Sequence, residues 1–127
     1  MSTSSEHEQF QNWYNTAVIG LASQGFQRSI IEGTNNCQYR GSNKTKCAVG
    51  YLIPDERYNT DIESRNINHN RVQKCVDPER AWSYKEIEFL NELQRCHDFG
   101  ETSSEMKTKL SALAIKYNLD IPKEICL

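Results

Sequence analysis

Three stretches of the chain repeat apolar residues at the spacing of one helix face. In the first, six apolar residues recur three or four positions apart (Phe10, Trp13, Tyr14, Ala17, Val18 and Leu21). This spacing places them on one side of an α-helix. Ser5-x-x-Glu8 is a capping box at the start, and Gly25 is a natural cap just beyond the end. A helix is therefore predicted over about residues 6–24, with residues 1–4 frayed.

Two further helices are predicted near the end of the chain. Ser83-x-x-Glu86 and Thr102-x-x-Glu105 are capping boxes that satisfy free N–H groups at a helix start. Apolar positions at helical spacing follow each of them (Ile87, Leu90 and Leu93; Met106, Leu110, Leu113, Ala114 and Tyr117). The predicted helices cover residues 84–98 and about 103–118, and a short loop joins them as an αα-hairpin. The tail, residues 120–127, either packs through its isoleucines or serves a partner.

The central stretch, residues 37–58, predicts a different kind of structure. Two short β-prone runs, residues 37–40 and 45–49, lie on either side of Gly41-Ser42-Asn43-Lys44, and such a turn sequence predicts a β-hairpin. Small residues at positions 47, 48 and 50 would let a short buried helix approach another backbone closely. The predicted fold class is α+β and mostly α: three main helices packed around a small β-hairpin and a short buried helix.

The segments beside this stretch carry weaker patterns. Residues 26–31 are expected to form a short strand or an extended lead-in. Residues 59–76 are rich in Asn and charge, with isolated apolar residues and no helical period. They predict a long polar loop or a weak strand at 71–76, which would suit a lid or a subunit contact. Residues 1–127 are expected to form one domain.

The composition and the N-terminal sequence indicate where in the cell the protein is located. Charged residues make up 25% of the chain and apolar residues 37%, which is typical of soluble globular proteins. No apolar run approaches the ~18 residues that a membrane span needs. The N-terminus lacks the basic and apolar regions of a signal peptide. A cytoplasmic location is therefore expected, with no membrane contact.

The five cysteines allow two interpretations. An odd count without a C-x-x-C motif argues against a secreted disulfide framework and a zinc ribbon. A metal site built from Cys37, Cys47, Cys75 and His97 is an alternative. The favoured interpretation is that all five cysteines are reduced, that Cys37 and Cys47 are small buried residues, and that the protein holds neither metal nor cofactor.

Charge is distributed unevenly along the chain. Between Arg28 and Lys74 there are eight Lys and Arg against five Asp and Glu, so this segment carries +3 while the remainder carries −5. A basic centre of this size suits a local anionic ligand better than a long nucleic acid, which needs a continuous basic face. Alternatively, these charges are solvated loop charges.

Motifs for catalysis are absent from the sequence. There is no Walker A, G-x-G-x-x-G, H-E-x-x-H or G-x-S-x-G sequence. Cys96 and His97 are adjacent on a predicted helix, so their side chains diverge by about 100° and cannot readily form a nucleophile–base pair. No catalytic residue is assigned, and a non-enzymatic function is predicted.

The candidate ligand contacts lie around the predicted turn. Tyr39 and Arg40 come before it and Lys46 lies across it. A guanidinium, an ammonium and an aromatic face together suit a phosphate and a base. Arg57 and Tyr58 are further candidates. In a regular hairpin Tyr39 and Arg40 face opposite sides, so both reach one ligand only if the turn twists or a second subunit contributes one of them.

Other roles for these residues are open. Arg40 can form a structural ion pair with Asp55 or Glu56. Gln94 and His97 share a helix face, so a polar pocket that reaches this helix would meet both. His97 also lies on the face of Leu90 and Leu93, which favours a core-edge histidine with satisfied hydrogen bonds.

The segments CQYRG, KCAVGYLIPDERY and LNELQRCHDF occur in this order and resemble a widespread family of small phage and prophage proteins. The likeness covers about residues 13–119. It differs at Tyr51, where a second cysteine is frequent in the family, and at Ser64, where glycine often follows the glutamate; both differences weaken a metal site. The resemblance implies a phage origin and an α+β fold, without an established activity.

Phage proteins of this size include anti-defence proteins that sequester nucleotide immune messengers without cleaving them. The basic turn and the missing catalytic motifs predict this function, with a homo-oligomer binding a cyclic oligonucleotide or related anion in the host cytoplasm. The alternative is a protein-binding module that inhibits or redirects a host or phage protein through its acidic helices. A hydrolase of nucleotides or ADP-ribose ranks third, because the sequence offers no clear base or metal set.

Overall fold

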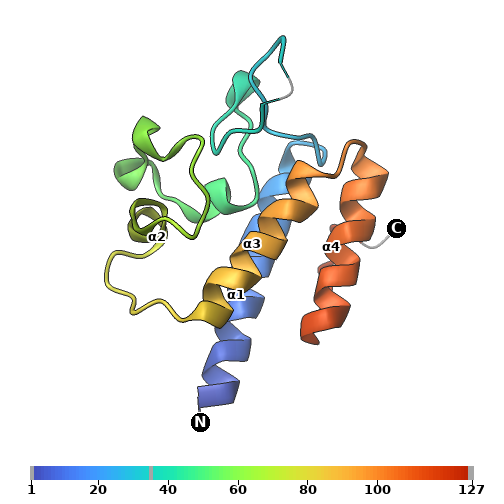
Figure 1. Ribbon diagram of the computed structural model, residues 1–127. Helices are drawn as coiled ribbons and strands as arrows, with labels where there is room; N and C mark the ends of the chain where they lie inside the picture. The colour runs from blue at the N-terminus through green and yellow to red at the C-terminus, as the bar shows by residue number, and fades with distance from the viewer. Residues whose placement is uncertain (1, 35, 126–127) are drawn as a thin grey trace.

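The computed structural model describes residues 2–34 and 36–125. Within them the chain forms three long α-helices, α1 (Ser2–Ser23), α3 (Tyr84–Asp98) and α4 (Ser103–Tyr117), and one short helix, α2 (Asn70–Val76). Four 3-10 helices and no β-strand complete the described part. The long helices lie side by side, and the turns between α1 and α2 cover one end of them (Figure 1). The fold is all-α, so the α+β prediction is wrong.

The predicted hairpin is a turn with one antiparallel bridge, between Arg40 and Lys46. The ladder stops at Tyr39, whose amide would bond the Cys47 carbonyl in a longer hairpin. It donates instead to the carboxylate of Glu63 (2.9 Å), and the Cys47 carbonyl accepts from the Tyr51 amide (3.2 Å). The turn itself is a 3-10 helix, η1 (Ser42–Lys44), in which Asn43 has φ 60°. Residues 26–31, expected as a short strand or an extended lead-in, form no strand, and Ile30 makes one isolated bridge with Cys37.

The two C-terminal helices match their predicted bounds. In α3, Ser83 Oγ accepts from the Glu86 amide (3.2 Å) and Glu86 accepts from the Ser83 amide (2.9 Å), which completes the capping box. In α4, Thr102 Oγ1 accepts from the Glu105 amide (3.1 Å), and the left-handed Asn118 ends the helix (φ 58°). The αα-hairpin is therefore confirmed.

Helix α1 confirms its predicted apolar face but not its start. All six residues of that face are buried (Phe10, Trp13, Tyr14, Ala17, Val18 and Leu21). At the end, the Gly25 and Phe26 amides donate to the carbonyls of Ala22 and Leu21 (3.0 and 2.8 Å), and Gly25 has φ 70°, as in a Schellman cap. The helix begins at Ser2, so residues 2–4 are helical and Ser5 is not its cap. Residue 1 and the Ser5 side chain lie outside the described residues.

The segment 59–76 is partly helical, which corrects the expected weak strand. It contains η4 (Thr60–Ile62) and α2. His69 Nδ1 accepts from the Arg71 amide (3.2 Å) at the start of α2, and the helix buries Val72, Cys75 and Val76. A helix of seven residues is too short to repeat an apolar period, which explains why the sequence pattern did not indicate it.

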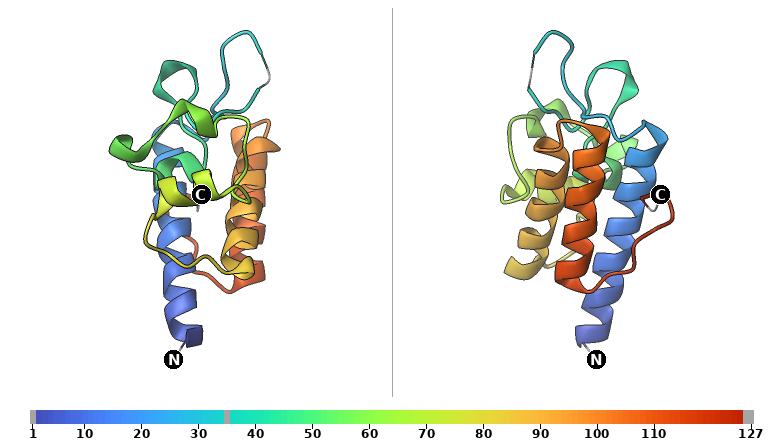
Figure 2. Two further views of the ribbon diagram at one scale, coloured as in Figure 1. Left: turned by 60° about the vertical axis from the view of Figure 1, so that its left-hand side comes forward. Right: turned by 90° about the vertical axis from the view of Figure 1, so that its right-hand side faces the viewer.

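A short buried helix, η2 (Val49–Leu52), lies against α1 and α3. A Cβ on Gly50 would lie 2.3 Å from the Tyr39 carbonyl oxygen, so the predicted close approach to another backbone is confirmed. Figure 2 shows the C-terminal segment returning along α1, where Gln11 bonds the backbone of Asp120. Ile125 is buried there, as predicted for a tail that packs.

In the part of the chain that the structure describes, no helix has both the length and the apolar character of a membrane span.

Candidate functional site

The turn at residues 41–45 brings two cationic side chains to one exposed carboxylate. Arg40 and Lys46 face each other in the bridge, and inside it the Gly41 amide donates to the Thr45 carbonyl (2.9 Å). The Arg40 guanidinium lies 2.7 Å from Asp55 Oδ1, and Lys46 Nζ lies 3.8 Å from the same oxygen. The Asp55 side chain is 82% exposed. We call Arg40, Lys46 and Asp55 the turn cluster; it is open to solvent.

Each cation of the turn cluster lies over a tyrosine ring. The guanidinium carbon of Arg40 is 4.4 Å from the centre of the Tyr58 ring, and Lys46 Nζ is 5.5 Å from that of Tyr51. These contacts attract a cation to the ring face and hold the two charges in place. Burial, followed by the hydrogen bond to Glu63, raises the pKa of Tyr58 to about 12. The hydroxyl therefore stays protonated at neutral pH and donates to Glu63 (2.6 Å).

Arg40 is also held by the backbone around it. Its guanidinium donates to the Ile53 carbonyl (2.9 Å), and its amide donates to Glu63. The structural ion pair that the sequence allowed for Arg40 is present, so a ligand would have to compete with Asp55 for the guanidinium. No role was predicted for Glu63, because its bonds to amides 23 and 24 positions away leave no local pattern in the sequence.

Two predicted contacts lie outside the turn cluster. Tyr39 is buried, and its hydroxyl donates to the Arg65 carbonyl (2.5 Å). Arg57 donates to the carbonyls of Cys75 and Val76 (2.9 Å each). It thereby provides hydrogen-bond partners for the free carbonyls at the end of α2. Of the predicted tyrosines and cations, the structure brings together Arg40, Lys46 and Tyr58.

The remaining predicted contacts, Gln94 and His97, belong to a polar cluster on α3. Gln94 accepts from the Val49 amide (3.0 Å) and donates to Asp98 (2.8 Å). His97 is fully buried. Its Nε2 accepts from the Ser29 amide (2.7 Å) and its Nδ1 lies 2.8 Å from Asp98 Oδ1. Both ring nitrogens are engaged, as expected of a core histidine with satisfied hydrogen bonds.

The same cluster contains the one metal-like group found among the described residues: ligand atoms of Cys37, His97 and Asp98 all lie within 4.8 Å of one another. The metal site considered from the sequence also included Cys47 and Cys75, and neither of them belongs to this group. The Ser29 amide donates to His97 Nε2, so the ring proton lies on Nδ1, which faces Asp98. A metal on Nδ1 would move that proton to Nε2, against the Ser29 N–H. The group therefore fits hydrogen bonding better than metal binding.

Four cysteines lie in the described chain, and all are free thiols; Cys126 lies outside it. Burial raises the pKa of Cys37 to about 11, with a further contribution from Asp98. Burial likewise raises the pKa of Cys96 to about 12, and it also raises the pKa of Cys47 and of Cys75. At neutral pH these thiols are protonated and hence weak nucleophiles.

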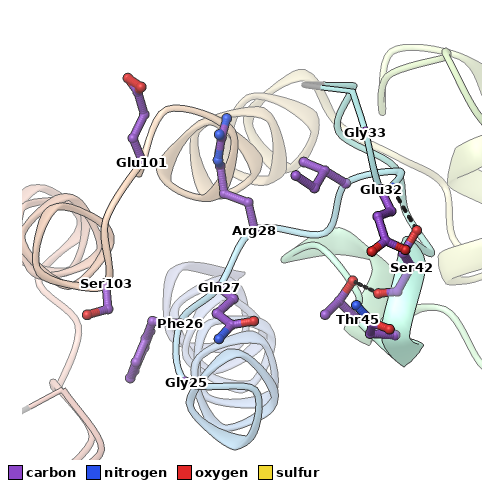
Figure 3. A pocket seen from close by; sticks show the side chains of 12 residues that line it. Gly25, Phe26, Gln27, Arg28, Glu32, Gly33, Ser42, Thr45, Glu101 and Ser103 are labelled. Atoms are coloured by element: carbon purple, nitrogen blue, oxygen red, sulfur yellow. Dashed lines mark hydrogen bonds between the residues drawn. The ribbon is translucent and has the colours of Figure 1, made fainter.

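A cavity of about 560 Å³ lies on the other side of the turn (Figure 3). The turn residues Ser42 and Thr45 line it, together with residues 25–28 and the start of α4. Figure 3 shows Arg28 between Glu101 on one side and Glu32 on the other. With one cation against two carboxylates, the cavity does not favour an anion. The sequence did not indicate it, because its walls come from three separated segments.

Comparison of the chain with protein-family models, with curated proteins and with solved structures finds no match. The resemblance to phage proteins therefore stays a prediction.

Proposed function

We propose that this protein is a non-catalytic binding protein that takes up an anionic, nucleotide-like small molecule at the turn cluster. The observation that carries the proposal is the convergence of Arg40 and Lys46 on one oxygen of Asp55. The carboxylate marks the point where two positive charges meet. A phosphate at that point would offer more negative charge and more acceptor oxygens than a carboxylate does.

A ligand phosphate can displace the Asp55 carboxylate from Arg40 and Lys46 at a small cost in free energy. An exposed ion pair contributes only about 0–1 kcal/mol, because water screens it and ordering its side chains costs entropy. Asp55 is 82% exposed, so it can turn into solvent. A phosphate carries more negative charge and more acceptor oxygens than the carboxylate that it would replace, so Arg40 and Lys46 can form more charge-assisted hydrogen bonds with it.

The described residues support binding of the ligand without its cleavage. Their thiols are protonated at neutral pH, and His97 has both nitrogens engaged. A reaction would need an activated nucleophile or a free base. Together with the resemblance to phage proteins, this supports sequestration of a nucleotide immune messenger, such as a cyclic oligonucleotide, in preference to its hydrolysis.

The test is a titration of the protein with a panel of mononucleotides and cyclic oligonucleotides, followed by denaturation and chromatography of the released ligand. We expect uptake of at least one nucleotide and its recovery intact. Arg40→Ala should weaken binding about ten- to a hundredfold through loss of the charge-assisted contact. Asp55→Asn should strengthen it, because the internal competitor loses its charge.

Asp61→Asn is the matched control, because Asp61 is also exposed and paired with an arginine, Arg71 (3.2 Å), outside the turn cluster. It should leave nucleotide affinity unchanged. Equal effects of Asp55→Asn and Asp61→Asn, or failure to take up any nucleotide, would refute the proposal. Recovery of a cleaved product would indicate an enzyme instead.

A further inference from the structure

A second surface feature lies between α3 and α4, away from the turn. It is a groove of about 390 Å³, here called the α3–α4 groove. Four of its lining residues are apolar (Cys96, Phe99, Ala112 and Leu113) and four are charged (Glu92, Arg95, Lys109 and Lys116). Phe99, which lines the groove, is 63% exposed. A large apolar side chain exposed in a groove marks a surface for interaction.

The rim of the α3–α4 groove is basic although the chain as a whole carries −2. Glu92 is its one acid, and its carboxylate is already held by Lys116 and by the Tyr117 hydroxyl. Among the described residues, no ion pair involves Arg95 or Lys109. Two positive charges are therefore left for a partner, beside an apolar floor.

This combination selects one kind of occupant. An amphipathic helix binds such a groove with apolar residues at i, i+3, i+4 and i+7, and its flanking side chains meet the rim. The charges on those flanks must complement Arg95 and Lys109 and so must be acidic. A two-fold contact between copies of this chain would place one basic rim against another, which disfavours self-association here. We propose that the α3–α4 groove is a docking site for an acidic amphipathic helix of a partner protein.

A designed peptide tests the proposal directly. The probe is a helix-forming peptide of about 15 residues with leucines at the anchor positions and glutamates on both flanks. The matched peptide carries lysine at each glutamate position. Titrations into isotope-labelled protein should perturb the NMR signals of the α3–α4 groove with the acidic peptide, and its binding should be at least about tenfold tighter than that of the basic peptide at low salt.

Two groove variants and two matched controls locate the site. Phe99→Asp should abolish binding of the acidic peptide, because it places a negative charge on the apolar floor of the groove. The double variant Arg95→Glu with Lys109→Glu should reverse the preference, so that the basic peptide binds more tightly. The controls change similar residues elsewhere: Ile19→Asp on α1, where the side chain is 51% exposed, and Lys74→Glu on α2, across the molecule from α4 (Figure 1). Both should bind like the original protein, and thermal melting should show all variants folded.

Several outcomes would overturn the proposal. These are no binding of the acidic peptide, equal binding of both peptides, or equal losses in the groove and control variants. Binding to vesicles of an anionic phospholipid while the acidic peptide stays free would assign the surface to a membrane. A fall in oligomer mass on Phe99→Asp would assign it to a second copy. None of these results depends on whether the turn cluster binds a nucleotide.

Discussion

At the scale of single residues, Asp98 joins the end of α3 to the segment that leads into the turn. Its carboxylate is bonded by His97 and by Gln94 (2.8 Å each), and it lies beside the Cys37 thiol. His97 in turn accepts a hydrogen bond from the Ser29 amide. Buried polar groups are costly unless bonded, so this cluster holds Ser29 and Cys37 against α3.

Cys37 gives this cluster a measurable pH dependence. Its folded pKa of about 11 lies above the ordinary value of 9.0, so the folded chain holds the thiol proton more tightly than the unfolded chain does. The stabilising contribution is complete below pH 9 and is lost as the pH rises through about 11. We expect the free energy of unfolding in urea to fall over this range, and to fall less in Cys37→Ala. Identical pH profiles for the two proteins would contradict this.

Sequence reasoning at the residue scale succeeded where the local pattern carries the information. The helix face of Leu90 and Leu93 correctly placed His97 in the core. The same reasoning put Tyr39 among the ligand contacts, whereas the structure buries its ring and pairs its hydroxyl with Arg65. Such partners depend on how distant segments meet, and a single sequence does not record that.

At the scale of elements, the fold depends on the close contact between η2 and the strand-like residues before the turn. A Cβ on Gly50 would lie 2.3 Å from the Tyr39 carbonyl oxygen, so the backbone itself would have to move. We expect Gly50→Ala to lower the free energy of unfolding by about 3 kcal/mol, at the upper end of overpacking effects.

Gly33→Ala is the matched control for Gly50→Ala. A Cβ there meets nothing within 4 Å, but φ is +87°, so only backbone strain of about 1–2 kcal/mol is expected. Urea unfolding of the two variants measures the difference. A smaller loss in Gly50→Ala than in Gly33→Ala would show that η2 can move aside and that the contact is not rigid.

The elements whose bounds the sequence predicted correctly are those with both a cap and a repeated apolar face. Helices α3 and α4 have both, and their bounds were correct. Helix α2 has only seven residues and a histidine cap, so its pattern was indistinguishable from a loop. The hairpin had suitable turn residues, but the Tyr39 amide, which a longer ladder would have used, donates to Glu63. A side chain from a distant segment thus competes with the ladder, and local turn chemistry does not indicate such a competitor.

At the scale of the whole molecule, the distribution of charge was predicted along the chain but not in space. Much of the basic centre is neutralised or bonded internally: Arg40 by Asp55, Arg71 by Asp61, and Arg57 by the end of α2. Arg95 and Lys109, at the rim of the α3–α4 groove, have no ion pair among the described residues, although they belong to residues 75–127, where seven Lys and Arg stand against ten Asp and Glu. Counting charges along a sequence does not show which of them are paired.

The exposure of the turn cluster leads to a prediction about assembly. Sites for small molecules usually bury about 70–90% of the ligand surface, whereas Asp55 at the centre of this cluster is 82% exposed. A nucleotide held by Arg40 and Lys46 of one chain would remain largely in water. A second copy placed against the turn would enclose the ligand and supply further contacts, so we propose that the functional form is a homo-oligomer.

Light scattering coupled to size-exclusion chromatography tests this prediction at micromolar concentrations, with and without the nucleotide that binds best. We expect a mass of at least two chains with the ligand, and a smaller response to the ligand in Arg40→Ala. Phe99→Asp should leave the mass unchanged, because the α3–α4 groove lies outside the assembly contact. A monomer mass at ligand saturation would mean that the turn cluster binds its ligand as an open surface site, and would contradict the prediction of an oligomer.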